Sequence, residues 1–115
     1  MHELSIVESL LDMCESQSLD ARGGRRRITS VVVVVGCLSC VEPEALRFCF
    51  DGCKAGTQAE DATLDIELEA GVGQCEHCGA RFEVTELHVP CACGAFDYAI
   101  TGGEGLVLKV LEFEA

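Results

Sequence analysis

The chain has 115 residues, nine of them cysteine, and a formal net charge of −12 at pH 7. This length suits one compact domain, or one domain with a small appendage. The longest apolar run, residues 31–35, is too short for a transmembrane helix, and the N-terminus lacks the basic start and cleavage site of a secretory signal. The acidic excess disfavours nucleic-acid binding, because such a surface repels phosphates.

Residues 4–19 are predicted to form a helix, and residues 22–27 the loop after it. The loop holds half of the basic side chains around two glycines. It is either a solvated loop, which we favour, or a docking patch for an acidic partner. The apolar side chains of the helix recur at the spacing i, i+3, i+4, i+7: Val7, Leu10, Leu11 and Cys14.

The next segments predict a small sheet and a second helix. Residues 28–35, a β-branched run ending at Gly36, indicate a central strand buried on both faces. Pro43 opens a helix to about Lys54, with an apolar stripe of Leu46, Cys49, Phe50 and Cys53. Residues 63–69 alternate as a half-exposed strand, and residues 106–114 indicate a last strand, buried more fully at its start.

Residues 71–105 differ from their surroundings, because glycines and turns dominate and apolar periodicity is lost. We expect a separate subdomain inserted between two strands. The predicted fold class is therefore α+β, with two helices packed on a small mixed three-stranded sheet and an inserted zinc-knuckle subdomain.

Four of the nine cysteines form two closely spaced pairs. Cys75 and Cys78 are a C-x2-C pair, and Cys91 and Cys93 follow as a C-x-C pair after a loop of twelve residues. Such pairs let two thiolates hold one ion, and four thiolates suit tetrahedral zinc. Because four protein ligands leave no open position, this zinc is expected to be structural.

The C-x-C spacing is tight, so His77 or His88 is an alternative ligand in place of Cys91. Free thiols or a disulfide pair are the other interpretations of these cysteines. Among the remaining five, Cys37 and Cys40 are also spaced C-x2-C. They suggest a redox pair, or a second metal site together with Cys49 and Cys53, but we favour core packing for the thiols on the helices.

The N-terminus offers a second kind of metal site. The amine of Met1, the amide and imidazole of His2 and the amide of Glu3 can form a plane of four nitrogens. A square-planar nitrogen set suits Ni(II) or Cu(II) rather than zinc. From spacing alone this signal is weak, because a histidine at position 2 is common.

Further motifs run through the chain in order. With the two cysteine pairs, they resemble the HypA/HybF family of hydrogenase maturation nickel chaperones, and the chain is identified as a member. The motifs are Met1-His2-Glu3-Leu4-Ser5-Ile6, Val34-Val35-Gly36, Leu38-Ser39, residues 41–46, Phe48, Gly56-Thr57, Ala62, Leu64, Ile66-Glu67 and residues 100–106.

The resemblance implies a nickel-binding α/β domain, residues 1–70 plus 106–115, and a zinc-binding subdomain, residues 71–105. It implies that Met1, His2 and Glu3 bind Ni(II), and that the two cysteine pairs bind zinc. It also implies delivery of nickel to the nickel–iron hydrogenase large subunit, together with the GTPase HypB, and in some organisms service to urease. We expect a cytoplasmic protein that is not an enzyme.

Two positions depart from the family pattern. The commoner second pair is C-x2-C, whose first cysteine would fall at Pro90, and the usual Gly-Glu-Leu becomes Gly36-Cys37-Leu38. Two rival functions remain: a zinc-ribbon adapter without a nickel role, and a thiol oxidoreductase that uses Cys37 and Cys40.

Overall fold

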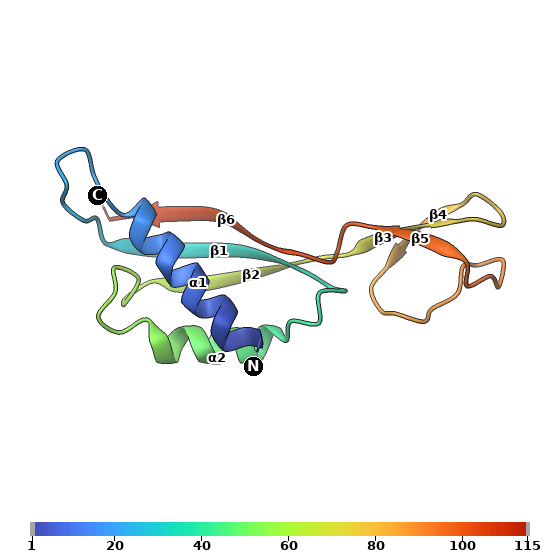
Figure 1. Cartoon of the computed structure of the whole chain (residues 1–115), viewed down its shortest axis with the longest axis horizontal. Coiled ribbons are helices and arrows are strands. Elements are labelled where there is room, and N and C mark those ends of the chain that lie inside the picture. Colours follow the sequence, from blue (N-terminus) through green and yellow to red (C-terminus); the bar gives the residue numbers. More distant parts are fainter. Residues whose placement is uncertain (1, 115) are drawn as a thin grey trace.

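The structure is a computed structural model that describes residues 2–114 and the side chains of residues 3–114. Two three-stranded sheets lie end to end in an elongated molecule of 57 × 28 × 17 Å (Figure 1). Among the described residues, no helix is long and apolar enough to cross a membrane. The elements in chain order are α1 (His2–Gln17), β1 (Ile28–Gly36), α2 (Pro43–Cys53), β2 (Thr63–Glu69), β3 (Gly71–Cys75), β4 (Arg81–Val84), β5 (Tyr98–Thr101) and β6 (Leu106–Phe113).

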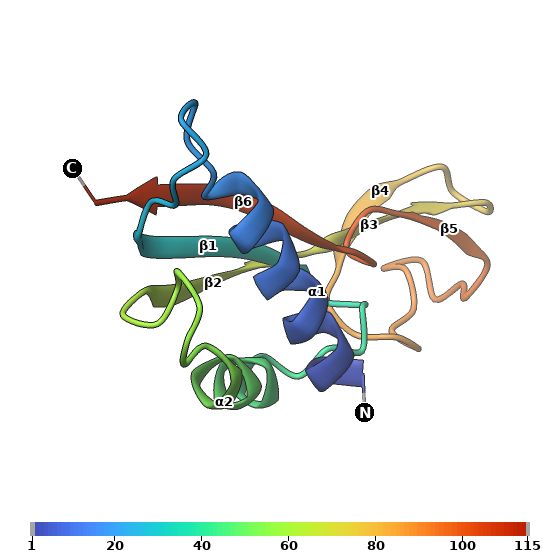
Figure 2. The ribbon, with the colours of Figure 1, turned by 60° about the vertical axis from the view of Figure 1, so that its left-hand side comes forward.

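The first sheet has the strand order β2-β1-β6 and packs against both helices. This sheet and the two helices together are called the helical lobe. β1 pairs parallel with β2 and antiparallel with β6, so that Val33 lies between Ile66 and Leu108. Both helices pack against the same face of this sheet, as Figure 2 shows. The predicted mixed three-stranded sheet with two helices is thus confirmed. The buried side chains of its core are Val7, Leu10, Leu11, Cys14, Ile28, Val31, Val33, Val35, Leu46, Phe50, Ala59, Ala62 and Leu64.

The predicted burial of two strands needs correction. β1 is buried on one face only. Val31 and Val33 are fully buried, but Val32 and Val34 are half-exposed because no helix among residues 2–114 covers the opposite face. β6 is not more buried at its start, since Val107 is 61% exposed and burial alternates along the strand.

The second sheet, in the order β4-β3-β5, was not predicted. Its strands are four or five residues long, too short to show a period, and two glycines hide the alternation of β3. Gly73 is required there, because a Cβ would lie 2.9 Å from Phe82 and 3.0 Å from Tyr98. These two rings pack edge to face across β3, 5.0 Å apart. This sheet and its loops are called the cysteine lobe.

Three glycines meet where the lobes join. A Cβ on Gly36 would lie 2.1 Å from the carbonyl oxygen of Gly103, and one on Gly103 would lie 2.5 Å from the Cα of Gly71. The turn after β1 is also held by backbone hydrogen bonds from Leu38 N–H to the Gly103 carbonyl and from Cys37 N–H to the Glu69 carbonyl. Both connections between the lobes are therefore fastened to the end of β1.

Candidate metal centre

The first cysteine pair lies on the turn that follows β3. Cys75 is buried at the end of the strand, and its amide donates to the carbonyl of Ala80. The amide of Gly79 donates back to the carbonyl of Cys75 at 3.0 Å. Gly79 has a φ of +76°, which favours glycine. This knuckle carries the Cys78 thiol beside that of Cys75.

The second pair repeats this pattern with one residue fewer. The amide of Cys91 donates to the carbonyl of Ala95, and the amide of Gly94 donates to the carbonyl of Cys91 at 2.7 Å. The closing glycine is thus three residues after the first cysteine rather than four, and its φ is +91°. The C-x-C spacing is accommodated by a tighter turn, with Cys93 in the place that Cys78 takes in the first knuckle.

The four sulfur atoms converge between the two knuckles. The Sγ atoms of Cys75 and Cys93 are 3.7 Å apart, those of Cys78 and Cys91 are 3.6 Å apart, and all four lie within 4.8 Å of one another. Sulfurs about 2.3 Å from a tetrahedral zinc are separated by about 3.8 Å. A disulfide needs about 2.05 Å. The spacing therefore suits a shared metal ion, and all nine cysteines are free thiols.

The knuckle backbone prepares one thiol to carry charge. The amides of Cys78 and His77 point at the Cys75 sulfur, at 3.4 and 3.3 Å. Although burial opposes them, these hydrogen bonds lower the pKa of Cys75 to about 6. For Cys91, the amide of Cys93 lowers the pKa, but burial and hydrogen bonds with the neighbouring thiols outweigh it and raise the pKa to about 11.

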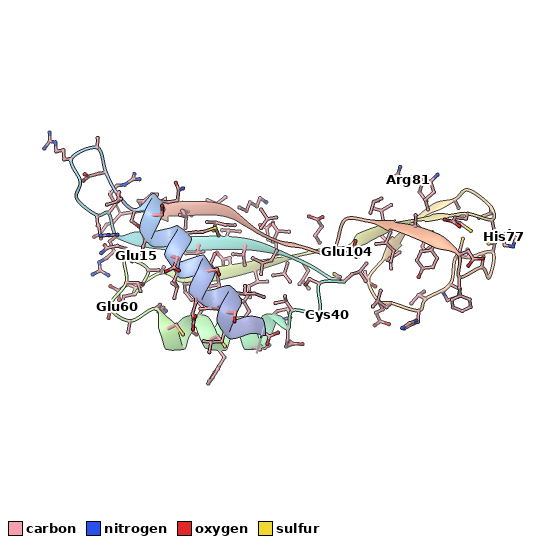
Figure 3. All side chains as sticks on the ribbon, viewed as in Figure 1. Glu15, Cys40, Glu60, His77, Arg81 and Glu104 are labelled. Carbon is pink, nitrogen blue, oxygen red and sulfur yellow. The ribbon has the colours of Figure 1, made fainter. Side chains whose placement is uncertain are left out.

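Neither histidine joins the sulfur cluster. Both His77 and His88 are exposed, and His77 lies at the tip of the cysteine lobe (Figure 3). His77 contributes its backbone amide to the site rather than its ring. Among the residues that the structure describes, the four cysteines are the only group of three or more potential ligands that converge on one point.

The other cysteines are not gathered into a second centre within the described part of the chain. Cys14 is fully buried in the core, as predicted, and this burial, reinforced by Glu15, raises the pKa of its thiol to about 11. Cys40 is exposed on the turn before α2, with a φ of +64° that is uncommon for a non-glycine residue (Figure 3).

The expected nickel ligands fall at the limit of the structure. Met1 and the side chain of His2 lie outside what is described, and α1 begins at His2. The Glu3 carboxylate accepts a hydrogen bond, at 3.4 Å, from the amide of Glu42 just before α2. Glu42 is also the N-cap of α2, because its carboxylate accepts a hydrogen bond from Glu44 N–H. Its contact with the start of α1 had no signal in the sequence.

Comparison with known proteins gives consistent matches along the whole chain. The family model described as "Hydrogenase/urease nickel incorporation, metallochaperone, hypA" matches residues 1–113. The hydrogenase maturation factor HypA of Geobacter sp. (strain M21) is 44% identical over 115 residues, covering 99% of this chain and all of that protein. HypA of Chlorobaculum tepidum is 42% identical with the same coverage.

Solved structures agree with the fold. The solution structure of the Ni metallochaperone HypA from Helicobacter pylori is similar, with a TM-score of 0.66 and 28% identity, over 98% of this chain and 97% of that one. A second solution structure, titled as HypA protein, gives a TM-score of 0.68 and 29% identity, over 99% and 97% of the two chains.

Proposed function

Because this chain belongs to the HypA family of hydrogenase and urease nickel-incorporation metallochaperones, we propose that it binds Ni(II) at its N-terminus and delivers the ion for the maturation of nickel–iron hydrogenase. Urease is a second client where the cell makes one. The observation that carries the proposal is the family match over residues 1–113, which includes the Met-His-Glu start.

The nickel ligands of this proposal are the amine of Met1, the amide and imidazole of His2 and the amide of Glu3. The first amides of an α-helix have no intrahelical acceptor, so in α1 the backbone nitrogens of His2 and Glu3 are free to bind metal. Glu3, Glu42 and Glu44 bring carboxylates to this end of the molecule, which favours a dication. Nickel must displace protons from the nitrogens, so acid releases it.

Zinc is proposed for the Cys75, Cys78, Cys91 and Cys93 cluster. The sulfur spacing supports it, and four thiolates leave no position for a reacting water. Under this proposal residues 1–70 and 106–115 form the nickel-binding domain and residues 71–105 the zinc-binding subdomain. The protein acts as a carrier rather than a catalyst, in the cytoplasm, with a HypB-type GTPase and the hydrogenase large subunit as partners.

A short N-terminal extension tests the nickel site. Gly-Ser-Gly placed before Met1 moves the free amine too far from the imidazole for both to bind one ion. A single added glycine would not serve, because a histidine third from the amine forms its own square-planar chelate with Ni(II). Titration calorimetry of the zinc-loaded protein should show tight Ni(II) binding to the native chain, and its loss both in the extended chain and in His2→Ala. His88→Ala is the matched control, because this exposed histidine lies in the cysteine lobe.

Unchanged nickel affinity in the extended chain would refute the N-terminal site. Zinc content measured on the same samples separates the two metals, since none of these changes touches a knuckle cysteine. A native chain that holds one zinc and no nickel would instead support the zinc-ribbon adapter.

A further inference from the structure

A groove follows the boundary between α1 and β6, on the side of α1 away from α2. It consists of two neighbouring cavities of about 480 and 360 Å³, both lined by Met13. The larger one lies against the second half of β6 and the C-terminal half of α1. The smaller one continues toward the start of both elements, where it reaches Ile6 and Leu106. Ser9 and Ser16 line the groove on the α1 side, where their small side chains leave it open.

β6 presents its backbone to this groove. Four consecutive residues, 108–111, line the larger cavity. The pairing with β1 is irregular between Leu108 and Val110, but the two faces of β6 are still both represented: Leu108 packs against the core on the helix side, and Lys109 pairs with Glu67 on the other side. The cavity therefore follows the edge of the strand rather than one of its faces. In the sheet order β2-β1-β6 this edge has no strand beside it among the described residues. Such an edge is a template for one more strand.

The smaller cavity is mainly apolar, whereas the larger one is half polar and has a basic side chain at one end. Met13, Leu108 and Leu111 supply apolar surface. Arg26 stands at the far end, 3.9 Å above the ring of Phe113, on the loop that contains four of the eight basic residues of the chain. Two other arginines of this loop pair with carboxylates of the chain itself, Arg25 with Glu15 and Arg27 with Glu60 and Asp61. Among the described ion pairs none involves Arg26, so the positive charge that the groove offers is that of Arg26.

We propose that this groove binds an extended segment of a partner protein, which adds to β6 as a fourth strand. Alternate side chains of the segment are apolar and face Met13 and Leu108, and its end beside Arg26 carries carboxylates. β6 has eight residues and is about 26 Å long, so a segment of about eight residues fills the edge. A second copy of this chain is a poorer occupant, because two molecules of charge −12 repel each other.

Defined peptides test the proposal without nickel. The probe is a fluorescein-labelled peptide of alternating valine and threonine with two glutamates at one end, and its partner probe carries glutamines instead. Fluorescence anisotropy should show binding of the first peptide, weakened about tenfold by the glutamines and by raised salt. Amide hydrogen exchange should show new protection in β6 at the amides that do not pair with β1.

Two tryptophan variants locate the binding site. Ser16→Trp fills the larger cavity and should reduce binding about tenfold or more. Glu8→Trp adds the same side chain on an exposed position of α1 that lines neither cavity, and it should leave binding unchanged. Thermal melts of both variants establish that the fold is kept, and Ser9→Trp repeats the block in the smaller cavity.

Three results would overturn the proposal. They are absence of peptide binding, equal losses in Ser16→Trp and Glu8→Trp, and self-association of the free chain that Ser16→Trp abolishes, which would make the groove a contact between copies. The groove uses none of the proposed nickel ligands. Peptide binding and nickel binding can therefore fail separately.

Discussion

Replacing Gly103 with alanine should weaken the junction between the lobes far more than the same change one residue earlier. Gly102 and Gly103 have φ values of +77° and +74°, so alanine costs about 1 kcal/mol of backbone strain at either position. At Gly102 the new Cβ meets only Glu69 Oε1, at 3.6 Å. At Gly103 it would lie 2.5 Å from the Cα and N of Gly71, and overpacking of that kind adds about 2 kcal/mol.

The expected losses in free energy of unfolding are thus about 1 kcal/mol for Gly102→Ala and about 3 kcal/mol for Gly103→Ala. Urea unfolding of the zinc-loaded protein, followed by far-UV circular dichroism, measures both. Gly36→Ala provides a second test, because that glycine has no positive φ and its Cβ would lie 2.1 Å from the Gly103 carbonyl oxygen.

Losses that agree within about 0.5 kcal/mol for Gly102→Ala and Gly103→Ala would refute the reasoning, since only the close approach distinguishes the two positions. A near-neutral Gly36→Ala would do the same, because the backbone of Gly103 would then have room to move.

Three further outcomes follow from named contacts. Cys75→Ser should abolish stoichiometric zinc, measured by metal analysis, whereas Cys40→Ser should retain it; equal zinc in both would remove Cys75 from the ligand set. The raised pKa of Cys14 means that the folded protein loses stability as pH rises from about 9 to about 11, so Cys14→Ala should flatten the dependence of stability on pH over that range. Arg26→Ala should cost about 1 kcal/mol in urea unfolding through its contact with Phe113, and Arg22→Ala, at an exposed position, close to nothing.

The helical lobe could be predicted from the sequence because its signals are long. The stripe that includes Val7 and Cys14 spans a helix of sixteen residues, and the run of valines spans a strand of nine. The error lay in the two-sided burial of β1. Consecutive valines fit a strand covered on both sides or on one, and only the placement of the helices decides between them.

For the cysteine lobe, the sequence predicted the cluster of cysteines but not the sheet that carries it. The spacing of Cys75, Cys78, Cys91 and Cys93 predicted a cluster, and the thiols do converge. The three strands beneath them were missed, because each is only four or five residues long, too short to show a period. The hydrogen bond from the Glu42 amide to the Glu3 carboxylate could not be predicted from the sequence either, since it joins residues 39 positions apart.

Because the molecule is elongated, the cysteine lobe has little buried apolar surface of its own. The accessible surface is 7011 Å², against about 6100 Å² for a compact chain of 12.3 kDa. Within the described part of the cysteine lobe, the buried apolar side chains are Cys75, Val84 and Cys91, and two of these three belong to the cluster of thiols for which zinc is proposed. Without an ion that joins the two knuckles, the cysteine lobe would have almost no buried apolar core. Under the proposed zinc binding, removal of zinc is therefore expected to unfold the cysteine lobe before the helical lobe.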